Sequence, residues 1–314
     1  MPVTSFADFT RLFVTTMAGV PKKEAIDNIF NPHVLFHKLK EKGSYKATGG
    51  SEIWVPLAPR TNSTVGWMTP QGTIDTAIQD PIEAGSWDWR ILGGSIAILK
   101  QEFDLNSDSP HRLINLMDAY KKQAEGSMRE SLVTALWAAA PGANDPDSIV
   151  TTVLNSGTIG GIDGAANTWW QSSVHNQGGS DAALSLDNIY NQIIAITYGT
   201  DGPDIALTTD ALYGKLMNLL DANQRFEDSK LADSGFKNIS VMGVPFVADK
   251  QAPAKSVYIL NTDHIYLYYH PDWNFSISQE VEVPNQFVRV AKIAWMGNLV
   301  TDGRRYQSHM DSQT

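Results

Sequence analysis

A long amphipathic pattern runs through residues 109–140. Apolar side chains recur every three or four positions, at Leu113, Met117, Tyr120, Ala124, Met128, Leu132 and Leu136, which is the spacing of one helical face. Ser109 and Pro110 are typical of a helix start, and Pro141 with Gly142 is typical of the chain beyond a helix end. The pattern predicts one helix of about eight turns, roughly 43 Å long, which we call the spine helix.

The preceding residues, 45–105, change to a strand-like character. Two runs rich in branched and aromatic residues, SEIWVPLAP and WRILGGSIAILKQEFDL, flank a polar stretch at 60–86 that is rich in Thr, Gly and Pro. We interpret residues 45–105 as a long two-stranded excursion, with the strands in those two runs. A hairpin of this kind is marginal alone in water, yet it carries Trp54, Trp67, Trp87 and Trp89. We therefore expect something outside the hairpin to cover these rings.

Residues 1–44 show two short apolar patterns, and neither is long enough to form a domain. Phe6, Phe9, Leu12, Phe13 and Met17 are near helical spacing, and Ile26, Ile29 and Phe30 form a second group. We interpret residues 1–44 as an N-terminal arm.

In the second half of the chain, helical and strand-like patterns alternate, as they do in a compact unit of mixed helices and strands. A helix with Ser185 at its N-cap carries Leu186, Ile189, Ile193 and Ile196 and ends at Gly199, the strand DIALTT follows, and a second helix holds Leu212, Leu216, Leu219 and Leu220. The runs NISVMGVPFVAD, SVYILN, HIYLYYH, NFSISQEVEV and FVRVAKIAWMGNLV are then typical of successive strands. The fold class is predicted to be α+β.

Between the spine helix and this unit lies GGIDGAANTWWQSSV, residues 160–174, which has no helical or strand period. An enzyme could use Asp163 as an acid or base beside an aromatic platform of Trp169 and Trp170. A structural protein could use the same residues to pin a connector between two domains. The segment alone leaves both readings open.

The composition excludes several kinds of functional site and argues against some classes of partner. The chain has 314 residues, of which 42% are hydrophobic, and it has no cysteine, which excludes disulfides, thiolate metal sites and cysteine nucleophiles. A net charge of −10 argues against a large nucleic-acid-binding surface. No segment is long and apolar enough to span a bilayer, and we expect no membrane partner. The one basic pair, Arg304 and Arg305, is expected to lie in a solvated tail.

No catalytic motif stands out. The chain lacks a phosphate-binding loop, a dinucleotide fingerprint and a Gly-x-Ser-x-Gly elbow. His33, His37 and Glu41 share helical spacing, which we interpret as a solvated helix face rather than a metal site. His264 after Asp263 favours a hydrogen-bonded structural histidine. Carboxylates near tryptophans, Asp163 with Trp169 and Trp170 or Asp272 with Trp273, keep a glycan hydrolase conceivable. We expect no enzyme activity, no cofactor and no metal.

The order of these features resembles the major capsid proteins of tailed bacteriophages, whose Hong Kong 97-type fold is shared with encapsulin nanocompartments. The resemblance covers nearly the whole chain. Its most specific segments are GGIDGAANTWW after the spine helix, PDIALTTDALYGKLMNLL, and MGVPFVAD followed by VYILNTDHIYL.

The resemblance implies a role for each segment. Residues 45–105 would be the extended loop that lies over a neighbouring subunit. Residues 106–155, completed by 271–314, would be the spine helix and peripheral domain, and 156–270 would be the connector and the axial domain at capsomer centres. Inter-subunit contacts are expected at Arg60, Trp67, Trp87 and Trp89. Asp163, Trp169 and Trp170 would anchor the connector, with the tryptophans buried against the spine helix or a neighbour.

Two departures from the family pattern matter. Related chains often carry a basic residue after the connector Asp and another after the second aromatic residue, where this chain has Gly164 and Gln171. Some members also join subunits covalently through a loop lysine. Here the only lysines between positions 45 and 105 are Lys46 and Lys100, both near the base of the loop, so a non-covalent shell is expected.

The function implied is that of a structural head protein. It would self-assemble into pentamers and hexamers of an icosahedral phage shell around double-stranded DNA, with scaffold, portal and decoration proteins as partners and with DNA held by nonspecific enclosure only. It would be assembled in the host bacterial cytoplasm and reside in the virion capsid. The alternatives are an encapsulin-type compartment and a glycan-active hydrolase.

Overall fold

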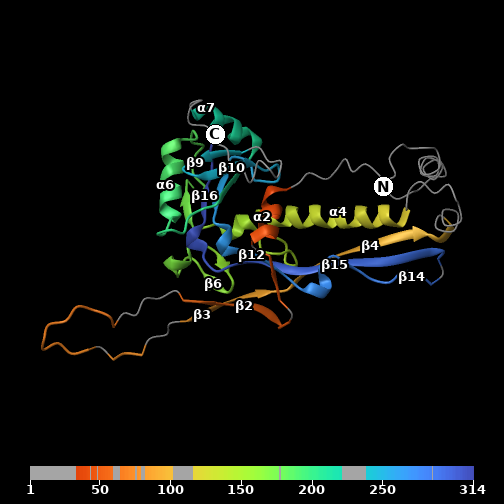
Figure 1. Ribbon diagram of the computed structural model, residues 1–314, viewed down its shortest axis with the longest axis horizontal. Coiled ribbons are helices and arrows are strands. Elements are labelled where there is room, and N and C mark those ends of the chain that lie inside the picture. Colours follow the sequence, from red (N-terminus) through yellow and green to blue (C-terminus); the bar gives the residue numbers. More distant parts are fainter. Residues whose placement is uncertain are drawn as a thin grey trace. The chain divides into compact units, whose positions relative to one another are not determined.

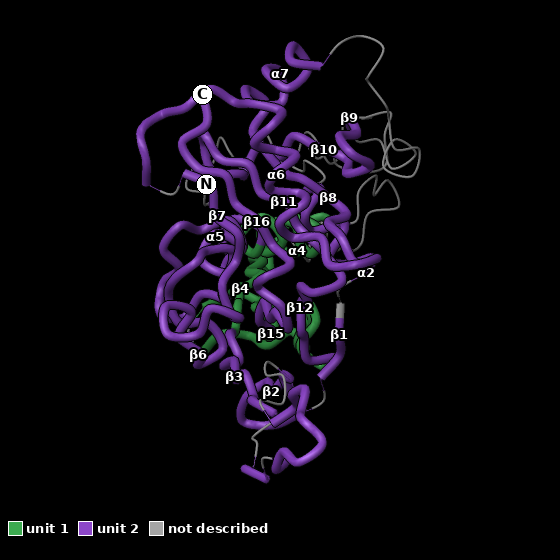
Figure 2. The backbone as a smooth tube through the Cα atoms, turned by 90° about the vertical axis from the view of Figure 1, so that its left-hand side faces the viewer, with its two compact units in different colours: residues 1–32, 91–132, 272–296 green, residues 33–90, 133–271, 297–314 purple. Residues whose placement is uncertain are grey.

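The computed structural model describes residues 33–42, 44–47, 49–58, 64–74, 76–78, 82–101, 116–176, 178–220, 238–284 and 286–314. The chain divides into two compact units (Figure 2): the described parts of 91–132 and 272–296 form unit 1, and those of 33–90, 133–271 and 297–314 form unit 2. The apolar patterns of residues 1–32, the predicted helix start at Ser109 and Pro110, and Arg60 lie outside the described residues.

Unit 2 contains a six-stranded mixed sheet. Its spatial order is β7 (Ser173–His175), β16 (Ser308–Met310), β11 (Val257–Leu260), β8 (Ile205–Thr208), β10 (Val244–Ala248) and β9 (Asn238–Val241). The pairs β7 with β16 and β8 with β10 are parallel, and the other three are antiparallel.

Both faces of this sheet are covered, which explains its nearly continuous apolar strands. One face packs against α6 (Leu186–Ile196) and α7 (Asp210–Leu219), which Figure 1 shows beside the sheet. The other packs against α2 (Val34–Lys42), α5 (Ile149–Thr152) and the last residues of α4 (Leu116–Leu136). In β8 the side chain of Ala206 belongs to the first core and Leu207 to the second, because neighbouring strand residues point to opposite faces. The predicted helix at 185–199 is confirmed to within a few residues, and so is the helix predicted from Leu212, Leu216, Leu219 and Leu220.

The run NISVMGVPFVAD, expected as one strand, forms the β9–β10 hairpin instead. Met242 and Gly243, between the two strands, have positive φ angles of 52° and 83°. Two consecutive left-handed residues make the tight turn whose twist suits a hairpin. The chain therefore reverses within this run.

The C-terminal residues depart from the expected domain boundaries. Residues 271–314 were expected to complete the peripheral domain, but β16 lies in the unit 2 sheet between β7 and β11. The last strand is buried along its length. This sheet is therefore completed by residues more than 130 positions beyond β7.

A second group of strands in unit 2 lies at the C-terminal end of β15 (Val288–Thr301). The strand β12 (Ile265–Tyr269) pairs antiparallel with its residues 297–301, and β1 (Ser44–Lys46) pairs parallel with β12. Short 3-10 turns, η3 (Thr262–His264) and η5 (Arg304–Tyr306), precede β12 and follow β15.

Unit 1 combines most of α4 with strands at the N-terminal end of β15. The strands β13 (Ser276–Ile277) and β14 (Val281–Glu282) pair antiparallel with β15 at residues 293–294 and 289–290. β4 (Arg90–Leu99) also pairs with β15, and Lys100 N donates to Phe287 O at 2.9 Å. A 3-10 turn, η4 (Pro271–Trp273), leads into β13.

The two-stranded loop has a different second strand from the one expected. β2 (Glu52–Leu57) pairs antiparallel with β3 (Glu83–Asp88) in a register that joins Ile53 to Trp87 and Leu57 to Glu83. The run at 89–105 was expected to pair with β2, but its β4 pairs with β15. The returning strand thus lies partly within the stretch expected to be the polar tip.

Candidate functional site

The β2–β3 hairpin has a buried base and an exposed distal part. Ile53, Val55 and Leu57 of β2 are buried, and they share a cluster with Ile159, Ile162, Trp170 and Val300. In the distal part Val65, Trp67, Ile74, Ile78 and Ile82 are all more than 60% exposed. The hairpin thus carries apolar side chains where the described residues of its own chain leave them in solvent.

Trp67 is the extreme case, since its side chain is fully exposed. It remains a predicted inter-subunit contact. A large aromatic side chain presents considerable apolar area at little conformational cost, which is why such residues are common as interface anchors.

Trp87 was expected at an inter-subunit contact, and that expectation is wrong. Its side chain is only 3% exposed within its own chain. The indole lies so close to Gly85 and Gly160 that a Cβ at either position would be 2.6 Å from a ring atom. The amide of Ser86 donates to the carbonyl of Gly160 at 3.0 Å. Trp87 therefore fastens the hairpin base to the connector, which leaves none of its ring for a neighbour.

Trp89 is half-buried by its own chain. Its Nε1 donates to the carbonyl of Gly50 at 3.0 Å, and its ring meets His270 edge to face. Only the remaining exposed part of the ring is open to a neighbouring subunit, so its inter-subunit contact stays a prediction.

The connector begins with a two-residue hairpin turn. β5 (Thr158–Ile159) and β6 (Ile162–Asp163) pair antiparallel across Gly160 and Gly161. Both glycines have positive φ angles, 61° and 76°, as this turn type requires. The glycines therefore give the connector a tight turn, and Gly160 also makes room for Trp87.

Asp163 serves this local structure. Its Oδ1 accepts from the amide of Ala165 at 2.9 Å, and its carbonyl accepts from the amide of Asn167 at 3.1 Å. These contacts stabilise the turn that leads into η1 (Thr168–Trp170). They assign Asp163 a turn-capping role of the kind Asx side chains often have.

Trp170 anchors the connector, though against a different partner from the one expected. It is 1% exposed, and its Nε1 donates to the carbonyl of Ile159 at 3.1 Å. Trp169 is half-buried, tilted against Trp170 with ring centroids 5.4 Å apart, and packs on the same cluster. That cluster contains the hairpin base rather than the spine helix. Because the rings face this core, they do not form an open platform for a sugar.

Gly164 and Gln171, where relatives often carry basic residues, contact each other. Gln171 Nε2 donates to the carbonyl of Gly164 at 2.7 Å. A Cβ at Gly164 would lie 2.8 Å from Nη1 of Arg304. The glycine therefore leaves room for a cation that comes from the C-terminal part of the chain.

Arg304 was expected in a solvated tail, but it is fully buried. Its Nε donates to Thr152 O at 2.8 Å, its Nη2 to Leu154 O at 2.7 Å and Ser156 O at 3.0 Å, and its Nη1 to Gly157 O at 3.3 Å. Burial lowers the pKa of this guanidinium to about 10. Arg304 thus satisfies carbonyls of the loop after α5, and no local sequence signal marks it.

Arg305, the second residue of the basic pair, is solvated as expected. Arg305 is exposed, and its guanidinium lies 4.8 Å from the ring centroids of both Tyr198 and Tyr306. The two neighbours therefore differ completely in environment, because η5 turns one side chain inward and the other outward.

His264 is held by two carboxylates. Its Nδ1 is 2.7 Å from Asp302 Oδ1, its Nε2 is 2.7 Å from Asp201 Oδ2, and its ring stacks on Tyr306 at 3.9 Å. Burial alone lowers the pKa of His264, but hydrogen bonds to Asp302 and Asp201 outweigh it and raise the pKa. Since both ring nitrogens are occupied, the imidazole ties three chain segments together. The structural interpretation of this histidine is confirmed.

Among the described residues no group of three or more His, Asp or Glu side chains is arranged to hold a metal ion. His37 and Glu41 are exposed on α2. Of the described helices, none is both long and apolar enough to cross a membrane.

Comparison of the sequence with protein-family models and with curated proteins finds no match. Solved structures do match. The capsid asymmetric unit of cyanophage A-1(L) is 17% identical, covers 99% of both chains and has a TM-score of 0.73. The capsid of a native GTA particle is 11% identical, covers 95% of this chain and 96% of its own, and has a TM-score of 0.68.

An encapsulin is also similar. The holo-SrpI encapsulin complex from Synechococcus elongatus PCC 7942 is 12% identical, covers 96% of this chain and 95% of its own, and has a TM-score of 0.61. Together these likenesses show that the chain has the fold of tailed-phage capsid proteins, which encapsulin shells share.

Proposed function

We propose that the protein is the major capsid protein of a tailed bacteriophage. Copies of it assemble into the pentamers and hexamers of an icosahedral shell that encloses double-stranded DNA. The observation that carries this proposal is the distal part of the β2–β3 hairpin, where Val65, Trp67, Ile74, Ile78 and Ile82 are exposed.

These side chains favour a partner for an energetic reason. Fully burying one large apolar side chain contributes about 1.5–3 kcal/mol, and a projecting hairpin exposes several at once. The base of the hairpin is already packed against the connector, so it can hold the distal part in a defined position. A neighbouring copy of the same chain is the partner that a closed shell supplies.

The charge of the chain suits enclosure of DNA without tight binding. With a net charge of −10, the subunit does not neutralise many phosphates, and nonspecific affinity depends on such neutralisation. In this proposal scaffold, portal and decoration proteins are further partners, assembly takes place in the cytoplasm of the bacterial host, and the mature protein resides in the virion capsid.

The proposal is tested by expressing the full chain alone and examining the product by sedimentation and electron microscopy. Closed shells or capsomers are expected. Trp67→Ala should lower the particle yield, whereas Trp273→Ala, which removes an exposed tryptophan outside the hairpin, should lower it less. A protein that stays monomeric at all concentrations contradicts the proposal, provided that it is folded.

An encapsulin-type compartment is the second candidate, because the Synechococcus elongatus encapsulin shares the fold at a TM-score of 0.61. The contents of purified particles distinguish the two: DNA supports the phage shell, and a co-purifying enzyme supports the compartment. A glycan hydrolase is disfavoured by the burial of Trp170. Hydrolase activity that disappears in Asp163→Asn would restore it.

We also propose that the shell is held by non-covalent contacts. The lysines at the base of the loop are Lys46 and Lys100, and Lys100 forms an ion pair with Glu282 at 3.2 Å. Particles boiled in detergent should run as one band near 34.5 kDa. A ladder of multimers resistant to boiling would show that subunits are joined covalently.

A further inference from the structure

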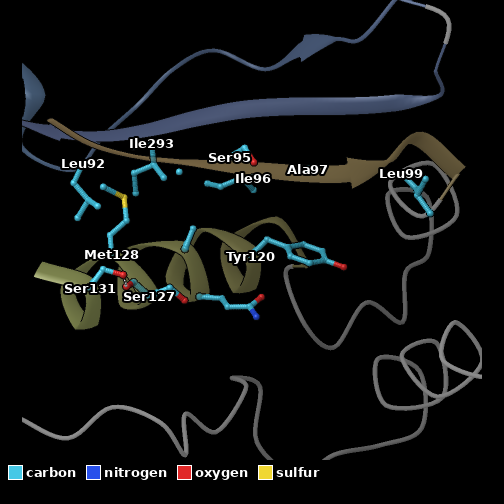
Figure 3. A pocket seen from close by; sticks show the side chains of 14 residues that line it. Leu92, Ser95, Ile96, Ala97, Leu99, Tyr120, Ser127, Met128, Ser131 and Ile293 are labelled. Carbon is cyan, nitrogen blue, oxygen red and sulfur yellow. Dashed lines mark hydrogen bonds between the residues drawn. The ribbon is translucent and has the colours of Figure 1, made fainter. Parts of the chain in front are cut away.

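Unit 1 contains an open groove of about 650 Å³ between β4 and α4 (Figure 3). Met128 points from α4 towards β4, and Ile293 of β15 points towards α4. The other side chains and backbone segments that line the groove are Leu92, Gly93, Gly94, Ser95, Ile96, Ala97, Leu99, Tyr120, Gln123, Ala124, Ser127 and Ser131. The groove follows α4 from Tyr120 to Ser131.

None of these lining residues carries a charge. Met128 and Ile96 are buried and form an apolar floor. The hydroxyl of Ser131 donates to the carbonyl of Ser127 at 2.9 Å, so the helix itself satisfies it. The groove therefore suits an uncharged, apolar ligand surface, and it does not suit DNA, which needs cationic partners.

Half of the lining residues are Gly, Ala or Ser, whose small side chains allow close approach. Gly94 is especially tight, since a Cβ there would lie 3.2 Å from Ile293 and 3.8 Å from the sulfur of Met128. Ala97, Ala124 and Ser127 leave space above this floor. Large side chains would have to come from the ligand.

Residues 6–17 of the same chain have the complementary pattern. Phe6, Phe9, Phe13 and Met17 fall on one side of a helix, and they are large where the groove is small. Twelve helical residues span about 18 Å at 1.5 Å each. The eleven steps of α4 from Tyr120 to Ser131 span roughly the same length, about 17 Å.

The link between residue 17 and α2 is also long enough for residues 6–17 to reach the groove. α2 begins at Val34, which packs in one core cluster with Val133 and Leu136 at the C-terminal end of α4. The sixteen residues between positions 17 and 34 extend to about 50 Å at most. All of α4, about 31 Å for 21 residues, lies within that reach.

We propose that the groove between β4 and α4 binds the apolar face of the chain's own residues 6–17. The segment lies against α4 and inserts Phe9 and Phe13 between the helix and β4. This inference goes beyond the proposed function, because it concerns contacts within one subunit and does not depend on shell formation.

Disulfide trapping tests it cleanly, because the chain has no cysteine of its own. Ser127→Cys places a thiol in the groove and is combined with Phe13→Cys or, separately, with Met17→Cys. The matched control combines Ser127→Cys with Thr15→Cys, which lies on the opposite side of the predicted helix. A disulfide forms only when the two Cα atoms come within about 7 Å.

The expected result is trapping at monomer mass, on non-reducing gels of the full-length, unassembled subunit, that is at least five-fold greater for the Phe13 or Met17 pair than for the Thr15 pair. Equal trapping in all three pairs, or no trapping in any, overturns the proposal. Trapping only as dimers overturns the assignment to the same copy and points to a second copy as occupant. Because the readout uses unassembled protein, it is independent of whether shells form.

Discussion

The indole of Trp87 lies directly against Gly160, and a Cβ on that glycine would sit 2.6 Å from the ring. The contact joins the base of the β2–β3 hairpin to the connector, two segments more than 70 positions apart. Together with the hydrogen bond from Ser86 to Gly160, it determines how the exposed distal hairpin leaves the body of unit 2.

Gly160→Ala should destabilise the subunit more than Gly161→Ala. Both glycines have positive φ angles, and this conformation costs about 1–2 kcal/mol for an alanine. Gly160→Ala adds a collision with Trp87, whereas the nearest atom to a Cβ at Gly161 is the Ser86 hydroxyl at 3.7 Å. Chemical denaturation of both variants measures the difference. Equal losses would mean that the Trp87 ring moves aside at no cost.

Trp87→Ala and Trp67→Ala should separate folding from assembly. Removing the buried Trp87 ring leaves a cavity and should cost about 3–5 kcal/mol of unfolding free energy. Removing the fully exposed Trp67 ring should change that free energy by less than about 0.5 kcal/mol while reducing particle yield. Thermal unfolding and sedimentation distinguish the effects. If Trp67→Ala assembles normally, the distal hairpin does not use this ring as an anchor.

Arg304→Met should be strongly destabilising. It removes the guanidinium donors of four backbone carbonyls. The carbonyls of Leu154 and Gly157 keep amide donors from Ser172 and Gly164, but each buried carbonyl left without a donor costs about 1–3 kcal/mol where water cannot replace it. Arg305→Met, which changes the exposed neighbour, is the matched control and should stay within about 0.5 kcal/mol. Denaturant titration of both variants tests this. Similar stabilities would mean that water hydrates the loop after α5.

His264 should make the subunit less stable as the pH rises. Its folded-state pKa is raised above the ordinary 6.5 by Asp302 and Asp201, against the effect of burial. The imidazolium contribution is therefore fully present below about pH 6.5 and is lost as the pH passes through the raised folded value. His264→Gln should remove this dependence. The check is the difference in unfolding free energy between variant and parent from pH 5 to pH 9, and a difference that does not change with pH would contradict the prediction.

His309, in contrast, should make the subunit less stable as the pH falls. It is 5% exposed and stacks on Tyr258 at 4.4 Å, and burial lowers its pKa to about 4. Between about pH 6.5 and 4 the unfolded chain binds a proton that the folded chain does not, so stability falls as the pH falls. The loss is of order 3 kcal/mol. His309→Phe, which keeps the stacked ring, should reduce it. If urea titrations give the same loss of unfolding free energy between about pH 6.5 and 4 for His309→Phe as for the parent, His309 is not responsible for it.

Local pattern was enough to predict much of this protein. The apolar spacing placed α6, α7 and the described length of α4, because one buried helical face repeats every three or four residues wherever the helix later packs. The strands β8, β11, β12 and β15 followed from runs of branched and aromatic residues. In the connector, the adjacent glycines and tryptophans indicate tight turns and an aromatic anchor, and the order of all these segments in the sequence resembles that of a capsid protein.

Only the tertiary structure decided which of these elements meet. β3 rather than β4 pairs with β2, and β16 enters a sheet whose other strands lie far away in sequence, because strand pairing depends on edges that distant segments supply. Arg304 and Arg305 are identical neighbours in the sequence. The side chain of Arg304 is buried against carbonyls about 150 positions away, whereas that of Arg305 lies in solvent. A residue's own neighbourhood in the chain carries its conformational preference, whereas its burial is set by whatever long-range packing brings against it.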